Sequence, residues 1–200
     1  MKGYYFITDA RLSRAGNISD VQNALAAGVR VVQYRDKWAD DAALIAEARL
    51  LRRLCQGAFF LINDRVEVAL AVGADGVHLG QKDLSCREAR RWLGAGKIIG
   101  ITVNTMEQAL EAARQGADYL GVAPIFATHT KPDAGVPAGL RLLREVRRRV
   151  NLPLIAIGGI NQDNAPAVIA AGADGICAIS AVVTRPDVQA AISGFQRLFG

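Results

Sequence analysis

The sequence lacks a hydrophobic run long enough to cross a membrane. Its apolar stretches, such as residues 152–160, fall far short of the about 18 to 20 residues that a membrane-spanning helix requires. A strand-like segment, Tyr4-Tyr5-Phe6-Ile7, follows the first residues directly, and no charged leader with an apolar core and a small-residue cleavage site precedes it. These absences predict a protein that has no membrane partner and stays in the cytoplasm.

Cysteine is scarce. The three cysteines, Cys55, Cys86 and Cys177, are odd in number, widely spaced and set in apolar or helical surroundings. This pattern fits neither a disulfide framework nor a zinc site. We predict that all three are ordinary packing residues.

Concentrated positive charge is also missing, although the net charge is +5. The basic residues are scattered, and the densest run, residues 147–149, ends a predicted helix, where cations complement the helix dipole. The pattern therefore favours a protein without a nucleic-acid partner. A non-catalytic phosphate- or nucleic-acid-binding protein stays open as an alternative, and it would bind in a strongly salt-dependent way.

Short apolar runs rich in β-branched and aromatic residues alternate with helical segments along the whole chain. The helical segments carry start signals, for example Asp40-Asp41 and Asn104-Thr105. Continuous apolar strands joined by helices indicate parallel pairing with both sheet faces covered, which is the α/β class. The eight predicted strands are residues 4–8, 29–34, 58–62, 75–79, 98–103, 118–123, 153–158 and 175–179.

A weak internal repeat separates helix from strand. Similar Gly-Ala-Asp joints occur at residues 73–75, 116–118 and 172–174, with a related Gly-Val joint at 28–29. The glycine-rich dinucleotide turn of an open doubly wound sheet is absent, because residues 8–11 follow the first strand. Since 200 residues, 51% of them hydrophobic, suffice for one core, we predict a single domain, residues 1–200, forming a (β/α)₈ TIM barrel of eight parallel strands.

Polar residues follow the predicted strands two to four, at the end of the barrel where active sites of this fold lie. Residues 33–37 bring an amide and two cations suited to phosphate oxygens. Asp64 and Asp83 arise from neighbouring strand ends, and paired carboxylates suit Mg²⁺. Two alternatives stay open: Asp64 pairs with Arg65, and Asp83 caps a helix over 84–93.

The later strands end in hydroxyls, a double glycine and a serine. Strand five ends with Thr102, which offers a hydroxyl, and residues 128–131 follow strand six with two hydroxyls, His129 and an ammonium. The backbone N–H groups after strands seven and eight, at Gly158-Gly159 and Ile179-Ser180, form a predicted phosphate cradle. His129 is either a general base or a hydrogen-bonding residue, and His78, at the end of a buried strand, is predicted to be structural.

Five motifs in chain order closely resemble the thiamine-phosphate synthase family. The resemblance spans nearly the whole chain, and it implies an enzyme, a transferase that joins the diphosphate of 4-amino-5-hydroxymethyl-2-methylpyrimidine to a thiazole phosphate. It further implies a barrel fold, Mg²⁺ as cofactor, and a dissociative route in which diphosphate leaves before the thiazole nitrogen attacks. The motifs are Gln33-Tyr34-Arg35-Asp36-Lys37, Asn63-Asp64-Arg65, residues 76–83, Thr128-His129-Thr130-Lys131 and Ile157-Gly158-Gly159-Ile160.

The resemblance also assigns roles to single residues. Asp64 and Asp83 would hold the metal, and Arg35, Lys37 and Lys131 would act as catalytic cations on the leaving diphosphate. Thr102 stands where the family more often has serine, and it keeps the hydroxyl. The implied substrate-binding residues are Gln33, Tyr34, Arg35, Asp36, Lys37, Asn63, Thr102, Thr128, His129, Thr130, Lys131, Gly159, Ile179 and Ser180.

Two further questions stay open at this point. A related barrel, the thiazole tautomerase, moves a proton on a thiazole carboxylate phosphate and would not need the full diphosphate and metal set, which this sequence keeps. The sequence also leaves open whether the chain forms a homo-oligomer.

Overall fold

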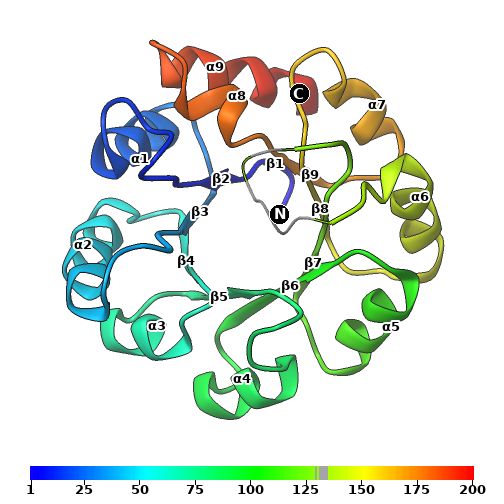
Figure 1. Cartoon of the computed structure of the whole chain (residues 1–200), viewed down its shortest axis with the longest axis horizontal. Coiled ribbons are helices and arrows are strands. Elements are labelled where there is room, and N and C mark those ends of the chain that lie inside the picture. Colours follow the sequence, from blue (N-terminus) through cyan, green and yellow to red (C-terminus); the bar gives the residue numbers. More distant parts are fainter. Residues whose placement is uncertain (129, 131–134) are drawn as a thin grey trace.

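Nine short strand segments form one parallel sheet in the computed structural model, which describes residues 1–128, 130 and 135–200 (Figure 1). Each segment is hydrogen-bonded to its neighbours in the order β1-β9-β8-β7-β6-β5-β4-β3-β2. The strands are β1 (Gly3–Tyr4), β2 (Phe6–Ile7), β3 (Val31–Tyr34), β4 (Phe59–Asn63), β5 (Gly76–Leu79), β6 (Ile98–Val103), β7 (Tyr119–Val122), β8 (Leu154–Ile157) and β9 (Gly175–Cys177).

The first strand of the chain closes the barrel. It is divided at Tyr5: β1 pairs with β9, with Gly3 opposite Gly175, and β2 pairs with β3, with Phe6 opposite Val32. Both halves lie in the predicted strand 4–8 or directly before it. The nine segments therefore occupy eight strand positions around the ring, and the predicted α/β TIM barrel is confirmed.

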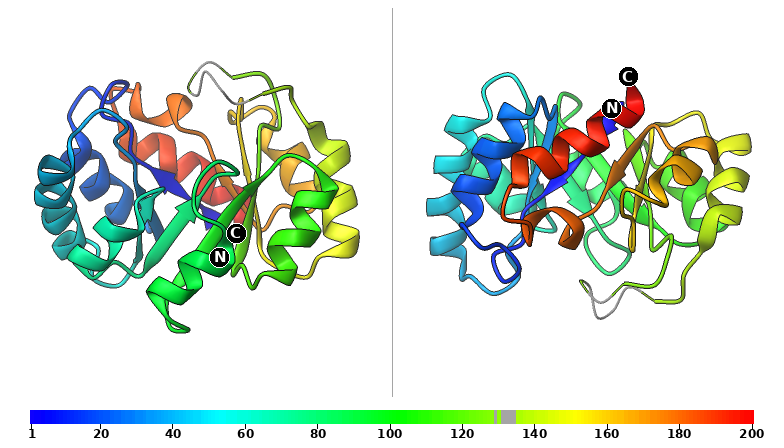
Figure 2. Two further views of the ribbon diagram at one scale, coloured as in Figure 1. Left: turned by 60° about the horizontal axis from the view of Figure 1, so that its bottom comes forward. Right: turned by 90° about the horizontal axis from the view of Figure 1, so that it is seen from above.

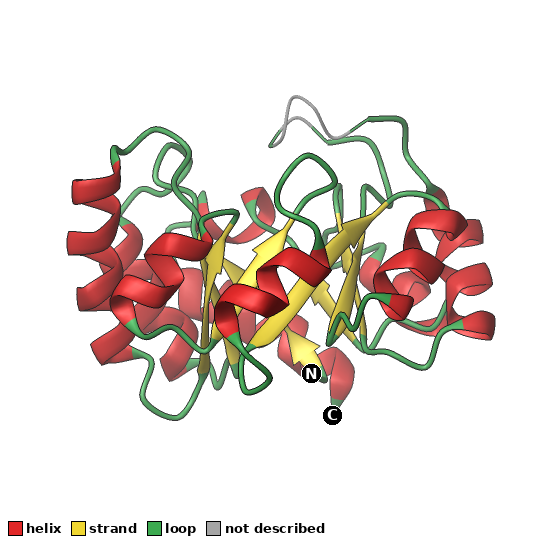
Figure 3. Ribbon diagram, turned by 90° about the horizontal axis from the view of Figure 1, so that it is seen from below, coloured by secondary structure: helices red, strands yellow, loops and turns green. Residues whose placement is uncertain are grey.

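Helices cover the outside of the sheet, and both termini lie at the end of the barrel opposite the loops that follow the strands (Figures 2 and 3). No helix in the described ranges is long and apolar enough to cross a membrane. The helices are α1 (Asn17–Ala26), α2 (Asp41–Leu54), α3 (Val66–Val72), α4 (Cys86–Leu93), α5 (Met106–Arg114), α6 (Gly139–Arg149), α7 (Ala165–Ala170), α8 (Ser180–Val183) and α9 (Val188–Gln196), followed by the 3₁₀ turn Arg197–Phe199.

Two of the start signals read from the sequence, Asp40 and Thr105, work as helix caps. Asp40 accepts a hydrogen bond from the Ala43 N–H at the start of α2, and Thr105 accepts one from the Gln108 N–H at the start of α5. Helix α6 has the basic run Arg147–Arg149 in its last turn, as predicted, where the cations complement the helix dipole.

The repeated Gly-Ala-Asp joint has a common structure. Its glycine adopts a left-handed conformation, as at Gly73 with φ 64°, which ends the helix. Its aspartate accepts a backbone N–H of the preceding strand in the sheet and an arginine from a helix; Asp75, for example, binds the Phe60 N–H at 2.8 Å and Arg52 at 3.1 Å. Asp118 with Arg90 and Asp174 with Arg147 repeat the arrangement. The repeat thus ties helix to sheet at the end of the barrel away from the predicted site.

Apolar side chains form an outer core between the sheet and the helices and a smaller core inside the barrel. The inner core consists of Tyr5, Ile7, Val31, Leu61, Tyr119, Ile155 and Cys177. Cys55, Cys86 and Cys177 are buried and free, which confirms that they are packing residues.

Candidate active site

A cavity of about 290 Å³ lies where the strands end and their polar loops begin. This is the end of the barrel at which enzymes of this fold carry out catalysis. Its polar lining comes from the C-terminal ends of β3 to β6 and from the segments that follow β3 to β9: Gln33, Arg35, Lys37, Asn63, Asp64, His78, Gln81, Lys82, Asp83, Thr102, Asn104, Thr128, Thr130, Gly159 and Ser180, with Ile179 beside them.

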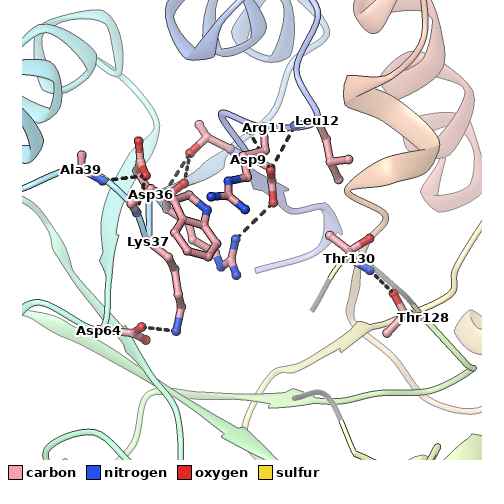
Figure 4. Close-up of polar contacts among 12 residues, drawn as sticks. Asp9, Arg11, Leu12, Asp36, Lys37, Ala39, Asp64, Thr128 and Thr130 are labelled. Atoms are coloured by element: carbon pink, nitrogen blue, oxygen red, sulfur yellow. Dashed lines mark hydrogen bonds and ion pairs between the residues drawn. The ribbon is translucent and has the colours of Figure 1, made fainter. Parts of the chain in front are cut away.

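The two predicted metal ligands meet on one side of this cavity. The backbone of Asp64 is left-handed, with φ 61°, and its N–H donates to the carbonyl oxygen of His78 at 2.9 Å. This unusual conformation turns the Asp64 carboxylate toward Lys37, whose ammonium lies 2.9 Å from Oδ2 (Figure 4). Asp83 accepts a hydrogen bond from the Gly80 N–H at 2.6 Å.

The pKa values of the two carboxyl groups shift in opposite directions. Burial opposes the ionisation of Asp64, but hydrogen bonds from Lys37 and Asp83 and the Lys37 charge outweigh it, so the pKa of Asp64 is lowered. Burial and then the hydrogen bond and charge of Asp64 raise the pKa of Asp83. Ionisation of either carboxyl therefore opposes ionisation of the other, and a bound cation would relieve this repulsion.

This pair fits a magnesium site that the substrate completes. Within the described ranges no group of three or more His, Cys, Asp or Glu side chains gathers around one point. Mg²⁺ is usually bound by one or two carboxylates, with water and substrate phosphate as its remaining ligands. Asp64 and Asp83 supply that number of hard oxygen ligands beside the cations of the cavity.

The two alternative roles predicted for these aspartates, an ion pair of Asp64 with Arg65 and a helix cap by Asp83, are both wrong. Arg65 pairs with Asp41 at 2.8 Å, while Asp64 pairs with Lys37. Helix α4 begins at Cys86, and Ser85 caps it through a reciprocal capping box with Glu88. Asp83 lies before that cap and is therefore available to the cavity.

Arg35 is held in place by Asp9. The guanidinium Nη1 lies 3.1 Å from Asp9 Oδ2, with only 15% of the Arg35 side chain and 9% of the Asp9 side chain exposed. The other carboxylate oxygen of Asp9 accepts the N–H groups of Arg11 and Leu12, each at 3.2 Å (Figure 4). Asp9 was not singled out from the sequence, because the ion pair joins residues that are far apart along the chain and lie in two loops.

Among the predicted substrate-binding residues that the structure describes, Tyr34 and Asp36 do not line the cavity. Gln33 points inward, so strand alternation turns the next residue, Tyr34, outward, where its hydroxyl donates to Glu47 of α2 at 2.6 Å. The Asp36 carboxylate turns back on its own loop and accepts the N–H groups of Trp38 and Ala39 (Figure 4). Contact of either side chain with a substrate would require a rearrangement.

The other side of the cavity carries hydroxyls and exposed backbone. The Thr130 N–H donates to the Thr128 hydroxyl at 3.3 Å (Figure 4). Gly158 and Gly159 both have positive φ, 103° and 63°, and a Cβ on Gly159 would lie 2.5 Å from the carbonyl oxygen of Ala127. Only glycine fits this close approach between two loops. The predicted residues His129 and Lys131 lie outside the described residues.

A hydrogen-bonded chain of buried side chains forms the floor of the cavity. Tyr5, Tyr119 and His78 link Gln33 on one side to Thr102 on the other. His78 therefore has a structural role, as predicted, and it also lines the cavity. The two tyrosines were read from the sequence only as strand residues.

Fold and cavity together define the class: a (β/α)₈ barrel enzyme with cations and paired carboxylates at the catalytic end, suited to phosphate-bearing substrates. The family described as thiamine monophosphate synthase (TMP-TENI) matches residues 4–182. The chain belongs to this family.

Individual relatives agree with that assignment. Thiamine-phosphate synthase of Chloroflexus aurantiacus is 52% identical over 190 residues, 94% of this chain and 88% of the relative. The enzyme of that name from Methanosarcina barkeri is 50% identical over 187 residues, 93% of this chain and 85% of the relative. The structure resembles that of thiamine phosphate pyrophosphorylase from Pyrococcus furiosus, with a TM-score of 0.90 and 41% identity over 98% of this chain and 94% of that one.

Proposed function

We propose that this chain is a thiamine-phosphate synthase. It joins 4-amino-2-methyl-5-(diphosphooxymethyl)pyrimidine to 4-methyl-5-(2-phosphooxyethyl)thiazole, or to the carboxylated form of that thiazole, and releases diphosphate. The observation that carries the proposal is the division of one cavity into a side with cations and paired carboxylates and a side with hydroxyls and a glycine turn. Two phosphorylated substrates need two such regions.

The first side receives the pyrimidine diphosphate. Arg35 and Lys37, with Lys131 as a third cation, bind the diphosphate and stabilise the negative charge that grows on it as it leaves. Asp64 and Asp83 would hold Mg²⁺, which would supply further charge neutralisation at the leaving group. Gln33, Asn63 and Thr102 hold the pyrimidine end of the substrate. Because Asp9 fixes Arg35 before substrate arrives, this charge needs little reorganisation.

The second side receives the thiazole phosphate. Hydroxyls, main-chain groups and an imidazole surround it: Thr128, His129, Thr130, Gly159, Ile179 and Ser180. The aminopyrimidine ring itself stabilises the methylene cation that is left when diphosphate departs, and the thiazole nitrogen then attacks it. This route requires no strong protein base.

We further propose that the enzyme works in the cytoplasm on these two small substrates, with no nucleic-acid partner.

A single assay tests the function. Purified protein is incubated with both substrates and Mg²⁺, and diphosphate release and thiamine phosphate formation are followed together, with EDTA-treated protein as a control. Equal amounts of both products that depend on both substrates support the proposal.

The same assay separates the alternatives. A thiazole tautomerase would interconvert thiazole carboxylate phosphate isomers without releasing diphosphate. A non-catalytic binding protein would give no product and would bind RNA or DNA in a salt-dependent way. Absence of thiamine phosphate under all metal conditions would rule out the proposed function.

Replacing Asp9 with asparagine is expected to raise KM for the pyrimidine diphosphate roughly tenfold, with a smaller effect on KM for the thiazole phosphate. Asparagine can keep the turn at Arg11 and Leu12 but loses the charge that orients Arg35. Steady-state kinetics with each substrate varied in turn measure the effect.

The matched control for Asp9 is Glu145→Gln, which removes an exposed ion pair with Arg141 on α6. It should leave both KM values unchanged. If Asp9→Asn folds normally and has wild-type KM for the diphosphate, Asp9 does not position Arg35.

A further inference from the structure

Three buried rings are joined in one hydrogen-bonded chain beneath the cavity: Tyr5 at the break between β1 and β2, His78 on β5 and Tyr119 on β7. The Tyr5 and Tyr119 hydroxyls lie 2.7 Å apart, the Tyr119 hydroxyl lies 2.7 Å from His78 Nδ1, and His78 Nε2 lies 2.7 Å from Thr102 Oγ1. At the other end, the Gln33 amide nitrogen donates to the Tyr5 hydroxyl at 2.8 Å. All these residues except Thr102 are buried, with 5% or less of their surface exposed.

The sheet makes room for these rings. A Cβ on Gly100 of β6 would lie 2.0 Å from Cζ of Tyr119, and a Cβ on Gly121 of β7 would lie 2.9 Å from Cε1 of His78. Two strand positions thus carry no side chain where a ring of the chain passes. The space is shaped for rings with polar tips, in an interior where an unpaired hydroxyl would be costly.

The direction of the hydrogen bonds follows from counting protons. The Tyr5 hydroxyl accepts from Gln33, so its own proton goes to Tyr119, whose hydroxyl lies within hydrogen-bond distance on the other side. The Tyr119 proton then goes to His78 Nδ1, which must be unprotonated. His78 therefore carries its proton on Nε2 and donates it to the Thr102 oxygen.

We infer that Tyr5, Tyr119 and His78 are positioning residues that fix the Thr102 hydroxyl as a hydrogen-bond donor into the cavity. Thr102 already accepts from His78, so its own proton is left for a ligand. The site thereby selects a substrate with an acceptor atom, such as a ring nitrogen or a phosphoryl oxygen, at this point. The direction of the chain stands independently of the proposed function, whereas its kinetic consequence rests on that function.

The tautomer of His78 tests the direction of the chain. The ¹⁵N chemical shifts of the imidazole distinguish Nε2–H from Nδ1–H, and the sequence contains only two histidines, so a His129→Gln variant assigns the signals. We expect the Nε2–H form in the full-length protein, and a shift of the Nδ1 signal in Tyr119→Phe. A predominant Nδ1–H form would overturn the inference, because the chain would then run the other way.

A double-mutant cycle tests whether Tyr119 acts through Thr102. We expect Thr102→Val to lower kcat/KM for the pyrimidine diphosphate roughly 10- to 100-fold, Thr102→Ser to stay within about threefold of wild type, and Tyr119→Phe to cost roughly three- to tenfold. In the double variant Tyr119→Phe/Thr102→Val, the tyrosine should add almost nothing. Additive losses would contradict a positioning role.

Tyr4→Phe is the matched control, because Tyr4 is also buried and its hydroxyl donates to the Ala178 carbonyl at 3.1 Å outside this chain. It should destabilise the fold about as much as Tyr119→Phe and leave kcat/KM within about twofold. These measurements distinguish failure of the proposed function from failure of the inference about the hydrogen-bonded chain. An inactive wild type with the Nε2–H tautomer overturns the function alone, whereas an active wild type with the Nδ1–H tautomer overturns the inference alone.

Discussion

Replacing Asp64 with asparagine is expected to lower the rate of thiamine phosphate formation by roughly 10²-fold or more. The change removes the carboxylate charge that pairs with Lys37 and that, in our proposal, would bind Mg²⁺. Asparagine is a better choice than alanine, because it tolerates the left-handed backbone at φ 61°, so that the loss reports on charge and not on folding. Steady-state rates over a range of Mg²⁺ concentrations, with the melting temperature as a check, measure the effect.

Asp41→Asn provides the control for Asp64. It removes another ion-paired aspartate, one that binds Arg65 at 2.8 Å on the surface with 66% of its side chain exposed. Its rate and its dependence on Mg²⁺ should match the wild type. Near-normal turnover by a folded Asp64→Asn variant would mean that the metal and the diphosphate bind elsewhere.

Replacing Gly76 with alanine is expected to destabilise the barrel by about 3 kcal/mol or more, enough to prevent accumulation of folded protein. A Cβ at this position in β5 would lie 1.9 Å from the backbone carbonyl oxygen of Ile98, the residue opposite it in β6. Backbone in the middle of a sheet cannot move aside as a flexible side chain can, so the two strands would have to separate. Soluble yield and thermal or urea unfolding measure the effect.

Gly96→Ala is the matched control for Gly76, because no atom lies within 4 Å of a Cβ added there. It should change the stability by less than about 1 kcal/mol. A Gly76→Ala variant as stable as Gly96→Ala would show that the β5 and β6 strands are less closely packed than the structure has them.

The sequence predicted where the strands end, and the barrel fold then brought those ends together. Asp64 and Asp83 are far apart in the chain, but each lies in the segment that follows a buried apolar strand, so parallel packing places them at one end of the sheet. The same argument placed Gln33, Lys37 and Thr102 around the cavity, as the structure has them. A repeated unit makes such predictions strong, because one rule applies at every strand.

The direction of individual side chains could not be predicted in the same way. Strands covered on both faces are apolar on both faces, so the pattern does not tell which residues point into the barrel. Tyr34 and Tyr119 both belong to apolar runs, but the first points to Glu47 outside the sheet and the second to His78 inside it. The buried chain and the pairing of Asp9 with Arg35 depend on such directions and on contacts between distant segments.

The division of the first strand at Tyr5 has a consequence for the order in which the barrel is assembled during synthesis. Gly3 and Tyr4 leave the ribosome before every other strand residue, but β9, with which they pair, lies more than 170 positions later in the chain. Domains fold on the time scale of elongation, and long-range pairing has to wait for the partner. The nascent barrel should therefore remain an open, curved sheet until Gly175–Cys177 emerges, with an unpaired edge that chaperones can bind.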